Sequence, residues 1–409
     1  MSNSISNNIP KVVILQSLLV AFYADMKCIN WTITYGYSSV NVEAGYMSIL
    51  YPGVILMSLI FAMIGKNNIS KRLSITCIII VSILLLFYIA TLSFIGPPKI
   101  GISMFLVMVI ASLLLPNIIR VNARIMIKGI MFFPFFAIFR QNRVFASVSS
   151  WQEVLSMETS YAFLVPIIAT IGYLFFYFKE ENSVQRKLTL LLSTINMVYF
   201  FQIVQYGSRG PILSVLLFLV VLYVIKTSQK GISVRHSSLF LVIIGAIMLV
   251  FTFSTSIPFV NEALNTIGLN VHALDKIIRL SEEGDITNGR EVINSITWSG
   301  IIESPFFGHG LDRFDANTGL LYPHNFILQI LYDGGVLLLL VLMVPVIVCS
   351  TRILRTCSKD EYAVFVILMF SSVPGALFSG DMWGVAGLWL FFGFILSRYF
   401  VIEEDKYSY

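Results

Sequence analysis

Long apolar runs are the feature that most limits how this chain folds. They fall at about 12–24, 46–64, 73–95, 100–119, 125–139, 161–178, 188–206, 211–225, 238–257, 324–348, 362–379 and 384–401. A run of roughly 20 apolar residues crosses the hydrocarbon layer of a bilayer as a helix, because each helix satisfies its own backbone hydrogen bonds there. The sequence therefore predicts an all-α polytopic membrane protein with about 12 transmembrane helices, and residues 1–409 form one integral membrane domain.

Composition agrees with this class of protein. Hydrophobic residues make up 57% of the chain and charged residues 12%, whereas a soluble domain has about 25% charged residues. The amino terminus has no basic region followed by a short apolar core and a cleavage site. We therefore expect the first helix to remain as an anchor.

The lysines and arginines predict the orientation. With the amino terminus in the cytoplasm, most of the 27 basic residues fall in cytoplasmic segments, as the positive-inside rule requires. Both termini are then cytoplasmic. The fifth run, IMIKGIMFFPFFAIF, is short and contains Lys128 and Pro134, so it is either a full span or a kinked or re-entrant piece. Removing it would invert every later segment, which favours twelve spans over eleven.

A polar segment at about 258–323 separates the ninth and tenth runs and is expected on the periplasmic side. Within it, VHALDKIIRL and REVINSITWSGIIE place apolar residues at helical spacing. The acidic stretch SEEGDITNG between them is rich in turn residues. We expect two amphipathic helices that cover the outer face of the bundle.

Several chemistries find little support. The four cysteines are scattered, so neither a zinc site nor a disulfide framework is expected. His309, Asp312 and Asp315 match no usual zinc spacing, and GHG at 308–310 is read as a plain turn. No Gly-rich phosphate loop is found. The prediction is a protein without metal or cofactor, and the +5 charge reflects membrane orientation and not nucleic-acid binding.

Arg209 lies in the stretch GSRG between two adjacent runs, with Pro211 behind it. An arginine at a span end often extends its side chain to a lipid phosphate. The flanking glycines favour a second interpretation, in which a backbone or ligand approaches closely and the guanidinium binds a phosphate.

Arg290 opens the second amphipathic segment, directly after Asn288 and Gly289. A cation is mildly unfavourable at a helix amino terminus. Arg290 is therefore either a solvated residue of the first turn or a ligand for an anion beside the helix-end amides.

His324 and Asn325 open the tenth run, after Pro323. Histidine changes charge near neutral pH and can accept a proton from a sugar hydroxyl, although an interfacial or capping role explains it equally well. Asp333 lies deeper, beside Gly334 and Gly335. An acid within a span costs roughly 2.5–3.5 kcal/mol, so we expect a partner or a cavity, with water reaching it through the nearby loop.

Together these stretches resemble the bacterial O-antigen polymerase and O-antigen ligase superfamily (Wzy and WaaL), which are membrane glycosyltransferases of the C type. The resemblance covers the carboxy-terminal half. It consists of SRG between adjacent spans, a long loop with a GR helix start and a P-x-x-G-x-G turn, and a span headed by HN with a glycine downstream.

The resemblance implies transfer of a sugar chain from undecaprenyl pyrophosphate at the periplasmic face of the inner membrane. It places Arg209 and Arg290 as catalytic ligands of the pyrophosphate and His324 as the residue that positions or deprotonates the acceptor hydroxyl. Arg313, Asn325 and Asp333 are further candidates for substrate binding. The partners it implies are lipid-linked repeat units, the bilayer, a chain-length regulator and the flippase of the same pathway.

The favoured member is an O-antigen polymerase. Ligases tend to carry Gly, Thr or Tyr three residues after the downstream glycine, where this chain has Leu338. Basic residues on two outer loops also suit an enzyme that grips two anionic carriers. An O-antigen ligase is the alternative. A flippase of lipid-linked sugars is disfavoured, because it requires ionisable residues along the middle of several spans.

Overall fold

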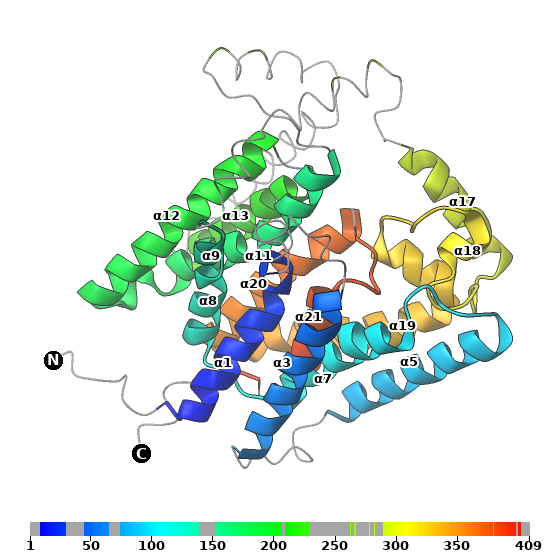
Figure 1. The fold of residues 1–409 in the computed structure, drawn as a ribbon, viewed down its shortest axis with the longest axis horizontal. Helices are drawn as coiled ribbons and strands as arrows, with labels where there is room; N and C mark the ends of the chain where they lie inside the picture. Colours follow the sequence, from blue (N-terminus) through cyan, green and yellow to red (C-terminus); the bar gives the residue numbers. More distant parts are fainter. Residues whose placement is uncertain are drawn as a thin grey trace.

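A computed structural model describes most of the chain, namely residues 9–29, 45–64, 74–138, 153–206, 209–229, 289–378, 380–397 and 400–401, with Glu262, Thr266, Ile278 and Glu282 singly. Its helices are α1 (Lys11–Ala24), α3 (Gly45–Ile64), α5 (Ile75–Phe94), α6 (Ile102–Phe105), the π-helix η2 (Leu106–Ala111), α7 (Ser112–Ile118), α8 (Ala123–Phe132), α9 (Pro134–Ile138), α11 (Glu153–Phe176), the 3-10 helix η4 (Phe178–Glu180), α12 (Ser183–Tyr206), α13 (Arg209–Gln229), α17 (Arg290–Glu303), α18 (Phe314–Thr318), α19 (Phe326–Thr356), α20 (Lys359–Phe378) and α21 (Ala386–Leu396). Figure 1 shows their arrangement.

The predicted fold class is confirmed: this is an all-α polytopic membrane protein. Each expected span within the described ranges coincides with a helix or with consecutive helices. Five helices in those ranges are long and apolar enough to cross a bilayer, and shorter apolar helices accompany them. The expected span at 238–257 and the expected helix at 271–280 lie outside the described residues, apart from Ile278.

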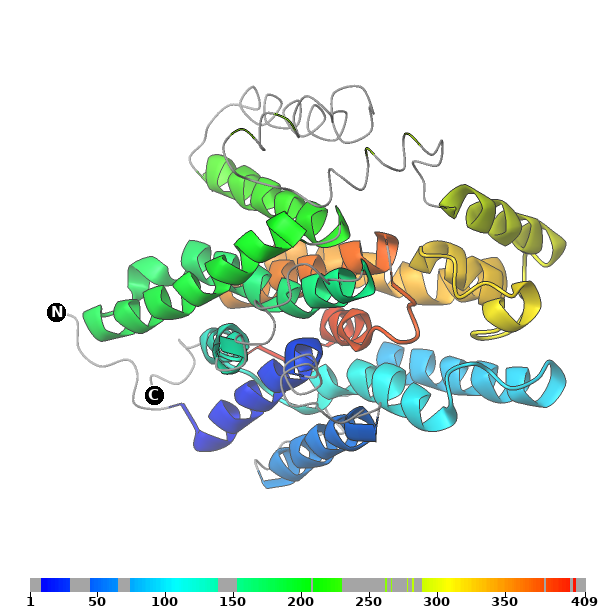
Figure 2. The ribbon, with the colours of Figure 1, turned by 45° about the horizontal axis from the view of Figure 1, so that its top comes forward.

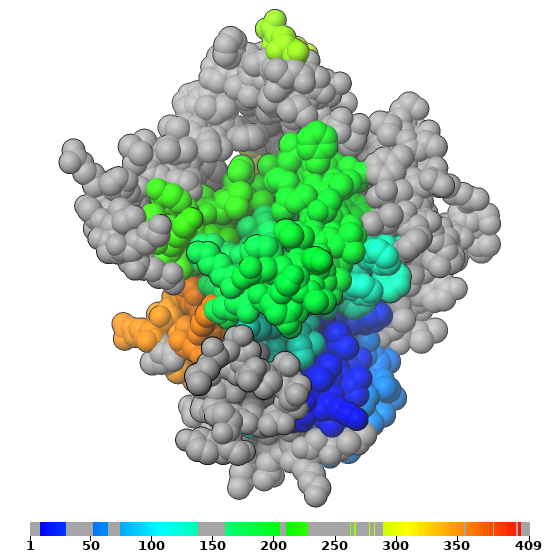
Figure 3. Space-filling model, turned by 90° about the vertical axis from the view of Figure 1, so that its left-hand side faces the viewer, coloured from blue at the N-terminus to red at the C-terminus, as the bar shows by residue number. Residues whose placement is uncertain are grey.

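Large apolar side chains cover the outside of the bundle. Leu86 on α5 is 65% exposed, Phe201 on α12 is 52% exposed and Val348 on α19 is 60% exposed. Figure 3 shows a face to which α12 contributes a broad surface. A surface of this kind is unfavourable in water, and it is the surface that lipid chains solvate.

The centre of the bundle is α21. Its residues from Leu388 to Leu396 are buried, and Figure 2 shows the helix end-on between the surrounding ones. A helix that is apolar on all sides belongs in the core. It packs closely on α7, where a methyl group placed on Gly393 would lie 2.5 Å from the Leu113 carbonyl oxygen.

The fifth expected span is kinked. It consists of α8 and α9, which meet at Phe133 in front of Pro134, and proline cannot donate the hydrogen bond that would continue the helix. Lys128, which appears in the sequence as a charge within a span, forms an ion pair with Glu181.

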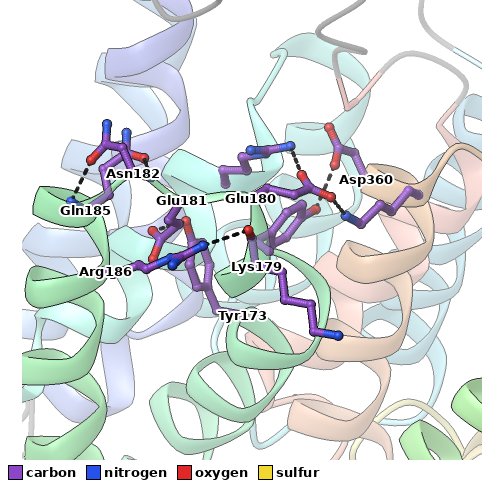
Figure 4. Close-up of polar contacts among 11 residues, drawn as sticks. Tyr173, Lys179, Glu180, Glu181, Asn182, Gln185, Arg186 and Asp360 are labelled. Atoms are coloured by element: carbon purple, nitrogen blue, oxygen red, sulfur yellow. Dashed lines mark hydrogen bonds and ion pairs between the residues drawn. The ribbon is translucent and has the colours of Figure 1, made fainter. Parts of the chain in front are cut away.

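This ion pair belongs to a polar cluster at one end of the bundle, drawn in Figure 4. Glu180 pairs with Arg124, at the start of α8, and with Lys359, at the start of α20. The hydroxyls of Tyr173 and Thr189 each donate to Glu181 Oε1 at 2.9 Å. Three of the basic residues predicted on one side of the membrane, Arg124, Lys128 and Lys359, therefore lie together at one end of the bundle.

The cluster also indicates whether the chain changes sides of the bundle between α8 and α11. Arg124 is the second residue of α8 and Glu180 follows α11, so the chain leaves this end through α8 and returns to it through α11. The start of α11 therefore lies on the side of the bundle where it would lie if α8 and α9 together formed one complete span.

Candidate functional site

The opposite end of the bundle holds the predicted site residues, where α17, α18 and the loop between α5 and α6 meet the start of α19 (Figure 1, right-hand side). Its framework is an interruption in α19. Gly335 has φ 65° and ψ −166°, which breaks the helix after Gly334. Four backbone groups that would bond to each other in a continuous helix are thereby released.

The segment 305–310 takes up these four groups. Val336 N donates to Pro305 O at 2.8 Å, and Leu337 N donates to Phe306 O at 3.4 Å. In return, Tyr332 O and Asp333 O accept from His309 N and Gly310 N, both at 2.9 Å. The loop thus supplies the hydrogen-bond partners that one turn of α19 would otherwise supply to itself. These hydrogen bonds hold the loop against α19.

Glycine is required on both sides of this contact. A methyl group on Gly308 would lie 2.3 Å from Asp333 O, and one on Gly335 would lie 2.3 Å from the Phe306 carbonyl carbon. Both glycines also have positive φ, which side chains disfavour. The interpretation of 308–310 as a plain turn was therefore incomplete, because the P-x-x-G-x-G turn and the glycine of the HN span form one interlocked unit.

Asp333 is the polar anchor of that unit. Its Oδ2 accepts hydrogen bonds from Trp383 Nε1 at 2.6 Å and from Asp312 N at 3.1 Å. The expected partner is thus confirmed. The expected access of water is wrong, because the interlocked loop covers Asp333 and the residue is 0% exposed. Asp333 thus holds the interlocked unit together from a buried position, and its predicted contact with substrate stays a prediction.

Asp312 joins this framework to the amino-terminal half. Its backbone adopts φ 52°, and its Oδ2 accepts from Ile100 N at 2.7 Å. Burial, reinforced by the negative charge of Asp381, raises the pKa of Asp312 to about 7.

Arg313 fastens the same loop. Its Nη1 donates to Pro97 O at 2.7 Å, and the guanidinium lies 3.4 Å from the position of a methyl group on Gly96. Nearby, Lys99 Nζ lies 3.2 Å from Asp315 Oδ2. Arg313 thus already binds a backbone carbonyl, and its predicted contact with substrate remains a prediction.

Tyr322 lies beside His324 and within the electrostatic influence of Arg290. The Tyr322 and His324 ring centroids are 4.4 Å apart, and His324 has the uncommon φ of 57°. Burial and the charge of Asp381 raise the pKa of Tyr322, while Arg290 and Lys99 oppose the shift. These groups therefore share one electrostatic environment.

Arg290 begins α17, as the sequence predicts, after Gly289 at φ 76°. Asn325, a predicted substrate ligand, is the N-cap of α19: its Oδ1 accepts from Ile327 N at 2.9 Å and from Leu328 N at 3.3 Å. That oxygen is already used for the helix start, so any contact with a substrate would involve the amide nitrogen.

The loop 380–385 is bonded to α19. Asp381 Oδ1 accepts from Gln329 Nε2 at 2.7 Å and from Trp383 N at 3.2 Å, while Gln329 Oε1 accepts from Met382 N at 2.9 Å. Burial raises the pKa of Asp381. These hydrogen bonds thus fix the loop to Gln329, near the start of α19 and close to His324 in the sequence.

Arg209 is the first residue of α13, and its side chain is outside the described atoms. The next residue, Gly210, packs on α11: a methyl group there would lie 2.2 Å from the Tyr161 hydroxyl oxygen. The close approach expected at this glycine is therefore made by Tyr161. Pro211 falls in the first helical turn, where its missing N–H is harmless.

The sequence did not single out Lys99, Tyr322, Asp381 or Trp383. Asp381 and Trp383 stand in SGDMWG between two apolar runs, and a carboxylate between two predicted spans was the available signal. Lys99 belongs to the amino-terminal half, which the resemblance does not cover.

The fold and this end of the bundle define a membrane protein with a polar site of basic and acidic side chains at one end. Residues 188–343 match a family model described as O-Antigen ligase. The match supports membership of the O-antigen polymerase and ligase superfamily and does not separate its two activities. It includes Arg209, Arg290 and His324, and it ends before Asp381. No curated protein matches the chain.

Proposed function

We propose that this protein is an O-antigen polymerase. It would join oligosaccharide repeat units linked to undecaprenyl pyrophosphate at the periplasmic face of the inner membrane. The observation that carries the proposal is the contact between the rings of His324 and Tyr322 at the end of the bundle where Arg290 begins α17, with the charges of Arg290, Lys99 and Asp381 acting on Tyr322.

The proposed reaction is one substitution at an anomeric carbon. The acceptor hydroxyl oxygen forms a bond to that carbon, the bond from carbon to the phosphate oxygen breaks, and the undecaprenyl pyrophosphate leaves with the bonding electrons. His324 takes the hydroxyl proton. Arg209 and Arg290 bind the charge that develops on the leaving group through paired hydrogen bonds. Holding both lipid-linked substrates in one site supplies proximity.

The orientation is part of this proposal. The cluster around Glu180 and Glu181 carries Arg124, Lys128 and Lys359, and the positive-inside rule assigns such an end to the cytoplasm. Arg290 and His324 then face the periplasm, and both termini are cytoplasmic. A periplasm-dependent reporter fused after Gly319 should be active, and the same reporter fused after Cys357 should be inactive.

An O-antigen ligase is the second candidate, because the matching family model is described by that activity. The residue that argues against it is Leu338, at the position where ligases tend to carry Gly, Thr or Tyr. Leu338 is buried and packs over Gly334, where a methyl group would lie 2.4 Å from the Leu338 Cδ2.

Deletion of the gene and resolution of surface lipopolysaccharide by size test both candidates. A polymerase deletion should leave core with a single repeat unit, restored to a ladder by the wild-type chain and not by Arg290→Ala at equal membrane level. Core without any repeat unit, with lipid-linked polymer accumulating, would identify a ligase. An unchanged ladder would exclude both activities.

A further inference from the structure

Lys27 lies where four helical segments meet, in a part of the chain that the family match does not include. It belongs to a short helical stretch that follows α1, and its Nζ is 6.0 Å from the centroid of the Tyr161 ring on α11. Tyr161 in turn contacts Gly210 on α13 and Gly375 on α20, where added methyl groups would lie 2.2 Å and 3.1 Å from its atoms. Tyr161 therefore links Lys27 to the start of α13, where Arg209 lies.

The depth of this junction can be estimated from helix geometry. Tyr161 precedes the end of α11 at Phe176 by 15 residues, and Gly375 follows the start of α20 at Lys359 by 16 residues. At 1.5 Å per residue, both lie about 22–24 Å from the end that carries Glu180. The hydrocarbon layer is about 30 Å thick, so the junction is near its opposite boundary, on the side of His324.

Lys27 is an exposed cation at that level. In the ranges that the structure describes, no carboxylate oxygen forms an ion pair with its Nζ. Asp381 is within electrostatic reach of it, but the Oδ1 of Asp381 is occupied by Gln329 and by Trp383 N. An ammonium group facing hydrocarbon is costly, so Lys27 requires a polar or anionic partner at this level.

Asp381 relates this lysine to the rest of the site. The same carboxylate acts on Lys27 and on Tyr322, which is in turn influenced by Arg290 and Lys99. Lys27 thus lies on the side of Tyr161. Arg290 and Lys99 lie on the side of Tyr322. A group with several negative oxygens is the kind of ligand that several cations bind together.

We propose that Lys27 is a further cationic ligand for the diphosphate of the lipid carrier, held in place by the ring of Tyr161. The proposal rests on the proposed function, because that function supplies a diphosphate lipid as donor. A lysine suits the role because its compact charge can bind a phosphate oxygen from a flexible stem.

The test is a binding measurement on the purified full-length protein in lipid nanodiscs, with undecaprenyl pyrophosphate as the probe. Lys27→Ala and Lys27→Met should each raise the dissociation constant at least tenfold, since both remove the charge and the second keeps the apolar stem. Lys27→Arg should stay within about threefold of the wild type. Lys187→Ala, a matched exposed lysine near the start of α12, should bind like the wild type.

The outcomes separate the two proposals. If the wild type binds the probe and the charge-removing variants bind it equally well, the role of Lys27 is overturned and the proposed function stands. If the wild type does not bind the probe, the proposed donor is wrong, and the role of Lys27 falls with it. If both charge-removing variants lose the folded state in thermal unfolding, Lys27 is structural and the proposal is likewise overturned.

Discussion

Trp383 Nε1 donates a hydrogen bond of 2.6 Å to Asp333 Oδ2, and both side chains are buried. This bond joins the loop after α20 to the interrupted part of α19, so it fixes Asp381 relative to His324. The arrangement of the candidate site depends on this buried contact.

Removing the indole N–H should therefore weaken the fold. In Trp383→Phe the buried carboxylate loses its shortest hydrogen bond, which should lower the free energy of unfolding by about 1–3 kcal/mol. Thermal unfolding of the purified protein measures the change. Trp298→Phe is the control because Trp298 is 49% exposed, and equal unfolding temperatures for the two variants would contradict the role assigned to Trp383.

The docking of segment 305–310 on α19 should not tolerate a methyl group. Gly308→Ala and Gly335→Ala each place a Cβ 2.3 Å from backbone atoms at a positive φ, so each should destabilise the protein by more than about 1 kcal/mol. Limited proteolysis within 304–312 should then be faster. Gly101→Ala is the matched control, because no heavy atom lies within 4 Å of the added Cβ; faster cleavage in that variant as well would indicate a nonspecific effect.

The polar cluster offers a pair of neighbouring carboxylates with different burial. Glu181 is 2% exposed and pairs with Lys128, whereas Glu180 is 43% exposed and pairs with Arg124 and Lys359. Glu181→Gln should cost about 3–5 kcal/mol, because it leaves a lysine charge without its partner in the interior. Glu180→Gln should cost about 0–1 kcal/mol. Chemical unfolding in mixed micelles gives both values, and the reverse order would be incompatible with this structure.

Asp312 should make stability depend on pH. Its pKa is raised by burial to about 7 in the folded protein, and an unfolded aspartate titrates at about 4. The folded state therefore holds the proton between these two values, and stability falls as pH rises through this range. The stabilisation is fully present below about pH 4 and lost above about pH 7.

Unfolding temperatures measured from pH 4 to pH 8 check this dependence. Asp312→Asn keeps an oxygen for Ile100 N and removes the titration, so the decline between pH 4 and pH 7 should become shallower. Asp315→Asn, on the more exposed neighbour that pairs with Lys99, should retain most of the decline. A variant Asp312→Asn with the full decline would assign the pH dependence to another group, such as Asp381.

Arg290 should be needed for activity and not for folding. It is the first residue of α17 and is only half-buried, so Arg290→Ala should leave thermal unfolding within about 0.5 kcal/mol, as for most surface substitutions. Polymer formation from a lipid-linked repeat unit should fall at least a hundredfold, and Arg290→Lys should recover only part of it, because lysine lacks the paired donors. Full activity in Arg290→Ala would remove this residue from the site.

The sequence by itself determined the fold class, because a bilayer permits few solutions for a run of 20 apolar residues. It also determined the start of α17 at Arg290, where a glycine in the left-handed region ends the preceding turn, and the break before Pro134. These features are local, since each depends on residues within one or two helical turns.

Only the tertiary structure decided which residues meet. Asp333 and Trp383 are 50 positions apart, and Asp312 and Ile100 are 212 apart, so no periodicity relates them. The hydrogen bonds of Asp333 and Asn325 could not be predicted for the same reason: whether a polar side chain satisfies a neighbouring backbone or side-chain group depends on what packs against it. Lys99 came to lie beside Asp315 through packing alone, because helices distant in sequence come together where their apolar faces and glycines allow close approach.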